Sequence, residues 1–192
     1  NYNLDGSMSL LSSTNGATIE GLSITLTGNY YNSENLYSGA LIGNATSTTI
    51  LGCNINNVEY SSYSPTILAS NYYFAKVVGQ ANNYITIKNT TLTGKYISRV
   101  SGTNINVAYI VGNVVCSDIS LVTSNGVTTA AYLSNISIVD SESNITAKYY
   151  GAVVANQNTS SIYAEDIYIS IIGTNSATNS NVICHSDKIS AS

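Results

Sequence analysis

Charged side chains are scarce in this 192-residue chain, where Asp, Glu, Lys and Arg together make up 8%, against about 25% in typical soluble domains. Only six residues are Lys or Arg and the formal net charge is -4, which argues against a nucleic-acid groove, because such a groove needs clustered cations. The hydrophobic fraction is nevertheless 44%, so the chain has enough apolar residues to form a core and does not have the composition of a disordered protein.

Proline occurs once and tryptophan not at all. The low proline content suits long strands, because proline cannot donate to a strand ladder. No apolar run reaches the roughly 18 residues of a membrane-spanning helix. The sequence has neither an initiator Met nor a signal peptide at Asn1, so we expect a mature or excerpted chain.

A phrase of six residues recurs along the chain. Its copies are "IEGLSI" at 19, "ILGCNI" at 50, "IKNTTL" at 87, "LSNISI" at 133 and "AEDIYI" at 164. The first, fourth and sixth positions are mostly apolar, and the third holds Gly, Asn or Asp, which best tolerate left-handed backbone angles. The phrase therefore predicts an apolar residue, a bend, and then the alternating inward residues of a strand.

A second phrase alternates with the first. Its copies include "YSGALIGNA" at 37, "YFAKVVGQA" at 73, "NVAYIVGNV" at 106, "YYGAVVANQ" at 149 and "NSNVICHSD" at 179. Each has an apolar pair, then a small residue, then a polar one. The small residues are Gly43, Gly79, Gly112, Ala155 and Cys184, and the polar ones are Asn44, Gln80, Asn113, Asn156 and His185. A partial earlier copy begins at Leu10.

Two alternating strand phrases with small and amide residues at fixed places predict a parallel β-helix, in which coils stack at about 4.8 Å and like residues lie over like residues. We expect an all-β solenoid of about five coils plus a partial N-terminal coil, spanning residues 1–192 as one array. The small residues would relieve crowding at a corner, and the amides would form a hydrogen-bonded ladder. The spacing is broken only at about residues 114–131, which we expect to leave the coil as a lateral loop or hairpin.

Phrases such as "YSGALIGNA" and "YYGAVVANQ", alternating with "ITIKNTTLTG", resemble the GLUG-type repeats of large bacterial and protist surface proteins. More distantly, they resemble pectin-lyase-like β-helices. The resemblance covers about residues 8 to 190 and implies a stacked β-helix from a secreted or cell-surface protein.

Enzymes of the pectin-lyase-like type place carboxylates, with Lys or Arg, close together on one strand face, whereas the ten acids here are scattered. Asp166 falls in the bend position, and Glu20, Lys88 and Glu165 share an outward column but belong to separate coils. General acid–base chemistry needs paired groups in a cleft. We therefore expect no catalysis and no cofactor.

The single histidine, His185, lies in the amide column, and adjacent residues of a strand face opposite sides, so Cys184 and His185 are not expected to form a nucleophilic pair. One histidine cannot supply a metal site either. The cysteines Cys53, Cys116 and Cys184 are expected to be free, buried thiols, because Cys53 and Cys184 belong to distant coils and occupy an inward and a small column.

Sixteen tyrosines are present, and three of them, Tyr37, Tyr73 and Tyr149, stand just before the apolar pair of the second phrase. If stacked, they could form a strip that binds sugar rings or a partner protein; packing along strand edges is the alternative. Of five N-glycosylation sequons, Asn144 and Asn158 lie outside the bend and amide columns and are the candidate acceptors.

Two functions remain open from the sequence. The first is a structural or interaction module of a secreted or cell-surface repeat protein, similar to an adhesin, spacer or filament, whose partners are like subunits end to end or other surface proteins. The second is a carbohydrate-binding or carbohydrate-active β-helix. The chain stops as a new coil is starting and begins with the closing strand of another, so we expect either an excerpt of a longer array or a subunit that associates end to end.

Overall fold

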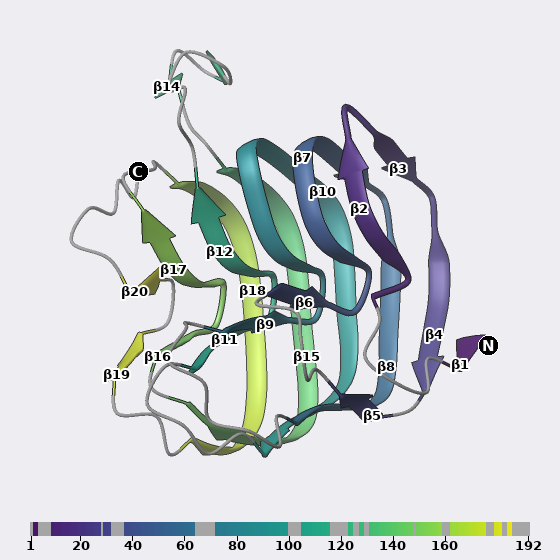
Figure 1. Cartoon of the computed structure of the whole chain (residues 1–192), viewed down its shortest axis with the longest axis vertical. Coiled ribbons are helices and arrows are strands. Elements are labelled where there is room, and N and C mark those ends of the chain that lie inside the picture. The colour runs from purple at the N-terminus through teal and green to yellow at the C-terminus, as the bar shows by residue number, and fades with distance from the viewer. Residues whose placement is uncertain are drawn as a thin grey trace.

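The computed structural model shows a parallel β-solenoid, which confirms the predicted fold class (Figure 1). The residues it describes are 2–3, 9–27, 29–31, 37–63, 72–99, 105–115, 123–124, 127–128, 131–147, 149–158, 162–175, 179–181 and 184–185. None of these residues is helical.

The larger parallel sheet holds thirteen strands within the described residues. They are β1 (Tyr2–Asn3), β2 (Leu11–Asn15), β3 (Thr18–Glu20), β4 (Ser23–Thr27), β5 (Asn29–Tyr31), β7 (Ile42–Leu51), β8 (Asn54–Tyr63), β10 (Val78–Arg99), β12 (Val111–Val115), β15 (Ala131–Thr146), β17 (Val154–Asn158), β18 (Ile162–Asn175) and β20 (Cys184–His185).

The smaller sheet takes one short strand from each of five successive layers of the described chain, in the order β19-β16-β11-β9-β6. These strands are β6 (Tyr37–Gly39), β9 (Tyr72–Ala75), β11 (Ile105–Ala108), β16 (Tyr149–Gly151) and β19 (Asn179–Asn181). Each leads into the next strand of the larger sheet, so the chain winds around a common core.

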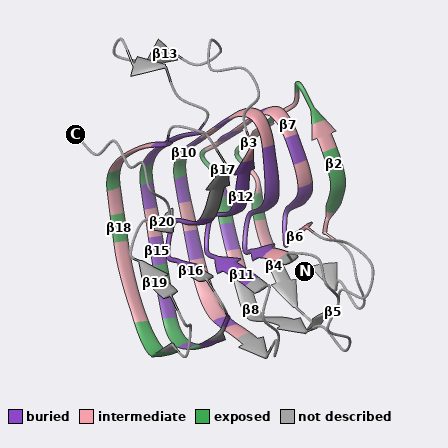
Figure 2. Ribbon diagram, turned by 60° about the vertical axis from the view of Figure 1, so that its left-hand side comes forward, coloured by how far each residue is buried: buried purple, intermediate pink, exposed green. Residues whose placement is uncertain are grey.

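The columns inferred from the six-residue phrase are confirmed by the strand register. Its first position pairs in the order Ile19, Ile50, Ile87, Leu133, Ala164. Its sixth pairs in the order Ile24, Ile55, Leu92, Ile138, Ile169. Side chains of both columns belong to one core cluster (Figure 2).

The bends of the same phrase are also confirmed. Positive φ angles occur at Gly21 (64°), Gly52 (59°), Asn89 (52°), Asn135 (49°) and Asp166 (52°). Glycine adopts this conformation without a Cβ clash, and Asn and Asp tolerate it better than other residues. The amide of Asn135 donates to Oδ1 of Asn89 at 2.8 Å, so these two bends are joined across neighbouring coils.

A second left-handed corner was missed by the sequence analysis. It lies at Gly16, Ser47 and Asn83, whose φ angles are 63°, 49° and 62°. Ser47 is a poor signal for such a corner, and the register of β10 against β7 shifts between Asn82 and Ile85, so the column is not evenly spaced in the sequence.

The register of the second phrase is confirmed except in its last copy. Asn44, Gln80, Asn113, Asn156 and His185 pair in succession. Cys184, however, pairs with Val154 and not with Ala155. The assignment of Cys184 to the small column is therefore wrong by one residue, because the register shifts between the two pairs of β17 and β20.

The small column exists because backbone crowds the corner between the two sheets. A Cβ at Gly79 would lie 2.5 Å from the backbone N of Ser38 and 2.7 Å from the carbonyl oxygen of Gly43. A Cβ at Gly112 would lie 2.6 Å from the carbonyl oxygen of Gly79. The glycines thus allow the backbone of one coil to pack directly against the carbonyl groups of the neighbouring coil.

The break in the repeat spacing has narrower limits than 114–131. Val114 and Val115 still pair with β10 and β17, and Ala131 already belongs to β15. Between them, β13 (Thr123–Ser124) and β14 (Val127–Thr128) form an antiparallel pair, a separate sheet of the described chain. Figure 1 places β14 beyond the stacked coils.

Replacing Gly79 by Ala should destabilise the fold by about 1–3 kcal/mol, the usual cost of overpacking, because the new methyl group meets rigid backbone on two sides. Gly52→Asn is the matched control. It changes a glycine at which an added Cβ would meet nothing within 4 Å to the residue found at two equivalent bends, and its urea midpoint should stay near that of the unmodified chain. Equal midpoints for the two variants would contradict the crowding argument.

Candidate functional site

The predicted tyrosine strip is only partly continuous. Tyr37 and Tyr73 pair in register and their rings stack, with centroids 5.4 Å apart and planes inclined by 14°. In the next layer the same column holds Asn106, which is buried and pairs with both Tyr73 and Tyr149. Asn106 therefore separates Tyr149 from the other two, so the three tyrosines do not form one continuous stack. The side chain of Tyr149 lies outside the described part.

A second tyrosine column, which the sequence analysis missed, lies on the outward-facing side of the larger sheet, where Tyr132 is buried and Tyr163 partly buried. Tyr132 and Tyr163 pair in register and stack with centroids 5.2 Å apart and planes inclined by 20°. Nζ of Lys88 lies 4.2 Å from the centre of the Tyr132 ring, a cation–π contact. Both tyrosines stand one residue before the six-residue phrase, and aligning that position would have revealed them.

Glu165 accepts hydrogen bonds from both tyrosines of this second column. The hydroxyl of Tyr132 donates to Oε1, and that of Tyr163 donates to Oε2 at 2.9 Å. These two hydrogen bonds lower the pKa of the Glu165 carboxyl, with a smaller contribution from the charge of Lys88. Glu165 is thus held ionised as an acceptor, which does not suit a general acid.

The outward column of Glu20, Lys88 and Glu165 has the predicted order, with Leu51 and Ser134 in the intervening coils. Asp166 has the left-handed φ of a bend. Within the described residues, no group of three or more His, Cys, Asp or Glu side chains is placed to hold a metal ion.

The amide column is hydrogen-bonded, but not by the simple rung-to-rung pattern that we expected. The Asn113 amide donates to Oε1 of Gln80 at 3.1 Å, and the Gln80 amide donates to Oδ1 of Asn82 at 2.9 Å. Asn82 in turn donates to Asn44. The connection between the Gln80 and Asn44 layers thus runs through Asn82, two residues farther along β10.

The cysteines, the histidine and the two candidate glycosylation sites are only partly covered by the described residues. Cys53 is a free, buried thiol, as expected, whereas the side chains of Cys116, Cys184 and His185 lie outside the described part. Asn144 is exposed on β15, and its glycosylation stays a prediction. Asn158 ends β17, and nothing is described of its side chain.

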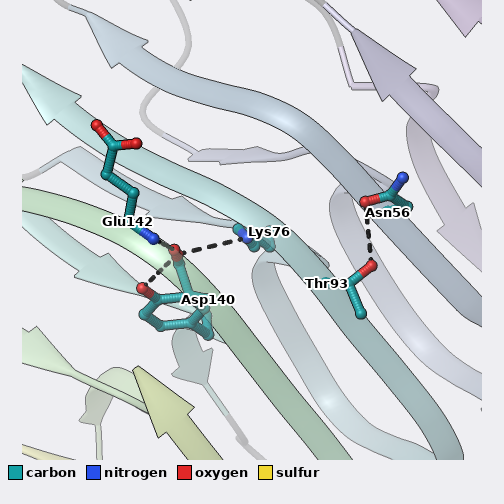
Figure 3. A network of polar contacts seen from close by, with 6 residues as sticks. Asn56, Lys76, Thr93, Asp140 and Glu142 are labelled. Carbon is teal, nitrogen blue, oxygen red and sulfur yellow. Dashed lines mark hydrogen bonds and ion pairs between the residues drawn. The ribbon is translucent and has the colours of Figure 1, made fainter. Parts of the chain in front are cut away.

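The structure brings together one pair of charged residues that the sequence analysis did not select. Nζ of Lys76 lies 3.7 Å from Oδ2 of Asp140, and the two side chains are 1% and 0% exposed. Lys76 is at the corner between β9 and β10, and Asp140 points inward from β15 (Figure 3). This pair is therefore enclosed by the core.

Polar and aromatic groups surround the Asp140 carboxylate. The Tyr109 hydroxyl donates to Oδ2 at 2.7 Å, and the backbone N–H of Glu142 donates to Oδ1 at 2.9 Å. Nζ of Lys76 lies 5.2 Å from the centre of the Tyr109 ring and 5.9 Å from that of Tyr96. Both oxygens of the carboxylate are thus hydrogen-bonded, as a buried charge requires.

Burial has the largest effect on the ionisation of this cluster. It lowers the pKa of Lys76 to about 8, although the charge and hydrogen bonding of Asp140 act in the opposite direction. Burial also raises the pKa of Tyr109, and the charges of Tyr150 and Asp140 add to that rise. Tyr109 therefore stays a proton donor at neutral pH.

The sequence did contain a signal for this pair. After the bend at Asn135, the inward side chains are two residues apart, so Ile136 and Ile138 are followed by Asp140. Lys76 precedes the apolar pair, at the position held by Ala40, Tyr109 and Ala152 in other copies of the phrase. A charged residue at each of two inward positions, where the equivalent residues of other coils are uncharged, predicts a buried partner of opposite charge.

The two end layers of the described stack differ from the interior layers in burial. Interior members of the inward columns, such as Ile50, Ile87 and Leu133, are fully buried. In the end layers the equivalent residues are only partly buried: Ile19, Leu22 and Ile24 at one end, and Ala164, Ile167 and Ile169 at the other. Figure 2 shows this change between β15, which is mostly buried, and β18, which is mostly intermediate or exposed.

The outer edge of β18 is the longest open strand edge at these ends. Among the described strands, β18 pairs only with β15. Its central segment, "IYISII" at residues 167–172, has no charge and no proline, and Tyr168 and Ile172 are 61% and 68% exposed. Such a segment favours pairing with a further strand.

Comparisons of this chain with protein-family models, curated proteins and solved structures find no match. The described part contains no helix long and apolar enough to cross a membrane.

Replacing either member of the buried pair alone should destabilise the fold strongly. We expect Lys76→Met and Asp140→Leu each to cost about 3–5 kcal/mol, because each leaves one uncompensated buried charge. The double variant should be more stable than either single variant, since no charge is then left in the core. Urea unfolding of the three proteins measures this difference, and strictly additive losses would contradict the pairing.

Proposed function

We propose that this chain is a non-catalytic structural and interaction module, whose end layers accept further coils of the same kind. The observation that carries the proposal is the partial burial of the inward columns at the two ends, where interior residues of the same columns are fully buried. A further coil on β18 would cover Ala164, Ile167 and Ile169 as β18 itself covers Leu133, Ile136 and Ile138 on β15.

The two end faces are suited to each other. Both continue the same columns, with Ile19 equivalent to Ala164 and Ile24 equivalent to Ile169. Stacking β3 and residues 23–25 of β4 of one copy on β18 of another would repeat the parallel pairing already made between successive layers, whereas Leu26 and Thr27 are already paired with β1. The same contact would bury the apolar surface of the end layers and give hydrogen-bond partners to the backbone groups of the strand edge.

The charged groups also support a structural role. The ion pair with the least exposure, Lys76 and Asp140, is sealed inside the core, and Glu165 is held by two tyrosine hydroxyls at the surface. Acid–base catalysis needs a titratable pair that a substrate can reach. We infer that these groups stabilise the stack.

The repeat phrases, which resemble GLUG-type repeats, favour a secreted or cell-surface protein such as an adhesin, spacer or filament. Its partners would be like subunits end to end or other surface proteins. The many uncharged polar side chains suit long outer surfaces that meet water without strong electrostatic attraction to nucleic acid.

Light scattering as a function of protein concentration tests the stacking surface. We expect the unmodified chain to form larger assemblies as its concentration rises, and Ile169→Lys to weaken this association by at least about tenfold. The reason is that a lysine in the inward column of the open edge opposes strand addition. Val139→Lys is the matched control, because Val139 is an exposed residue on the outward side of β15 and its replacement leaves the edge of β18 unchanged.

Two results would contradict the stacking proposal. One is a folded chain that stays monomeric over a wide concentration range. The other is an equal reduction of association by Ile169→Lys and Val139→Lys, which would indicate a non-specific effect of added charge. Circular dichroism should show that both variants keep the strand content of the unmodified chain.

Carbohydrate binding is the second candidate function, and the stacked, partly exposed rings of Tyr37 and Tyr73 favour it. Aromatic ring faces are suitable contacts for sugar rings.

A glycan array tests this candidate. If it is correct, a bound glycan should lose affinity by at least about tenfold in the double variant Tyr37→Ala/Tyr73→Ala, since two stacking contacts are removed. Tyr84→Ala removes a partly exposed tyrosine of β10 and should leave binding unchanged. Absence of glycan binding, or equal binding by all three proteins, would contradict this function.

A further inference from the structure

The buried pair of Lys76 and Asp140 has an arrangement that stacking alone does not require. It brings a primary amine within 3.7 Å of a carboxylate oxygen, with both side chains almost completely withdrawn from water. The two residues come from different coils, the corner before β10 and the inner face of β15. An amine and a carboxyl group held together in this way are the two reactants of an amide bond.

We propose that Lys76 and Asp140 react with each other in the folded protein and form an intramolecular isopeptide bond between Nζ and Cγ. The bond would join the corner before β10 covalently to β15. The site is therefore one of self-modification, and its only substrates are two side chains of this chain.

The reaction balances without an oxidant or a co-reactant. The lone pair of the Lys76 amine forms a bond to Cγ of Asp140, and the bond from Cγ to one carboxylate oxygen breaks. That oxygen leaves as water with two of the three protons of the lysine ammonium group, and the third proton stays on the amide nitrogen. An ammonium ion and a carboxylate thus become a neutral amide and one water molecule.

Two groups of the cluster are placed to assist this step. The backbone N–H of Glu142, 2.9 Å from Oδ1, can stabilise the negative charge on that oxygen in the tetrahedral intermediate. The hydroxyl of Tyr109, 2.7 Å from Oδ2, can donate a proton to the departing oxygen and recover one from the attacking amine. Oδ2 is also the oxygen that lies 3.7 Å from the amine.

The environment favours condensation over the ion pair in three ways. Holding the two reactants together raises their effective concentration, which reaches about 10⁵–10⁸ M for well-oriented groups. The product has no buried charge, so the desolvation penalty of the ion pair is removed. Burial also lowers the pKa of Lys76 to about 8, and a larger fraction of the amine is therefore unprotonated and nucleophilic at neutral pH.

A surface ion pair of the same chain shows how burial changes the tendency of an amine and a carboxylate to form an amide. Lys95 and Glu142 also bring an amine to a carboxylate, but their side chains are 41% and 65% exposed. Water solvates both charges there, so the ionised forms persist and amide formation is not favoured. This pair serves as an internal control for proximity without burial.

The test is the mass of the intact chain, measured after denaturation. We expect the purified 192-residue chain to be lighter than its sequence mass by one water molecule. Tryptic digestion should fail to cleave after Lys76, and tandem mass spectrometry should find the peptide containing Lys76 joined to the one containing Asp140. Lys95 should be cleaved normally.

Two variants separate the isopeptide bond from other losses of water. Lys76→Arg cannot form the amide and should have its full sequence mass, whereas cyclisation of Asp140 with its own backbone would persist in this variant. Asp140→Asn should lose ammonia in place of water and give the same cross-linked peptide. Tyr109→Phe should slow cross-linking by about 10²-fold or more if its hydroxyl transfers the proton.

An unmodified chain with its full sequence mass would overturn the proposal, whatever the stability of the variants, because this measurement needs no variant to fold. A water loss that persists in Lys76→Arg would overturn it as well. Neither result bears on the stacking of end coils, since association is measured separately by light scattering.

Discussion

The stacking of parallel strands at one fixed spacing is the constraint on which the rest of this structure depends. It places each side chain against its equivalents in the neighbouring coils, so a residue must suit a column and not only its own coil. Glycines recur where the next backbone would meet a Cβ, and Gly, Asn and Asp recur where φ is positive. Hydrophobic burial then runs as a continuous core along the stack.

Those recurrences explain why so much of the fold could be predicted from the sequence. The bends at Gly21, Asn89 and Asp166 and the apolar column from Ile19 to Ala164 are repeated often enough for their spacing to be read directly. The corner at Ser47 could not be recognised in this way, because serine has no strong preference for a left-handed conformation. The shift that places Cys184 opposite Val154 depends on a local irregularity of pairing, which a spacing rule does not contain.

The candidate site was harder to predict, for a different physical reason. The repeats show what the residues of a column share, whereas Lys76 and Asp140 are charged residues at positions where other coils have uncharged ones. The role of each depends on the presence of the other. Their partnership depends on the three-dimensional path that brings the corner before β10 to the inner face of β15 (Figure 3). Asn106, by contrast, could have been recognised, because it stands first in its copy of the second phrase, as Tyr73 and Tyr149 do in theirs.

The parallel direction of the strands gives the solenoid a polarity. The edge of β18 lies at one end of the stack, and the edges of β3 and β4 lie at the other end. The two ends therefore present different sets of backbone donors and acceptors. Two copies related by a twofold axis would bring like edges together and reverse the strand direction at their junction. Only a head-to-tail repeat continues the ladder of hydrogen bonds between strands. Such a repeat forms an open filament and not a closed oligomer. The length of an assembly of this kind is then determined by whatever binds its last free edge, and a partner that recognises one face alone is sufficient to stop growth at that end.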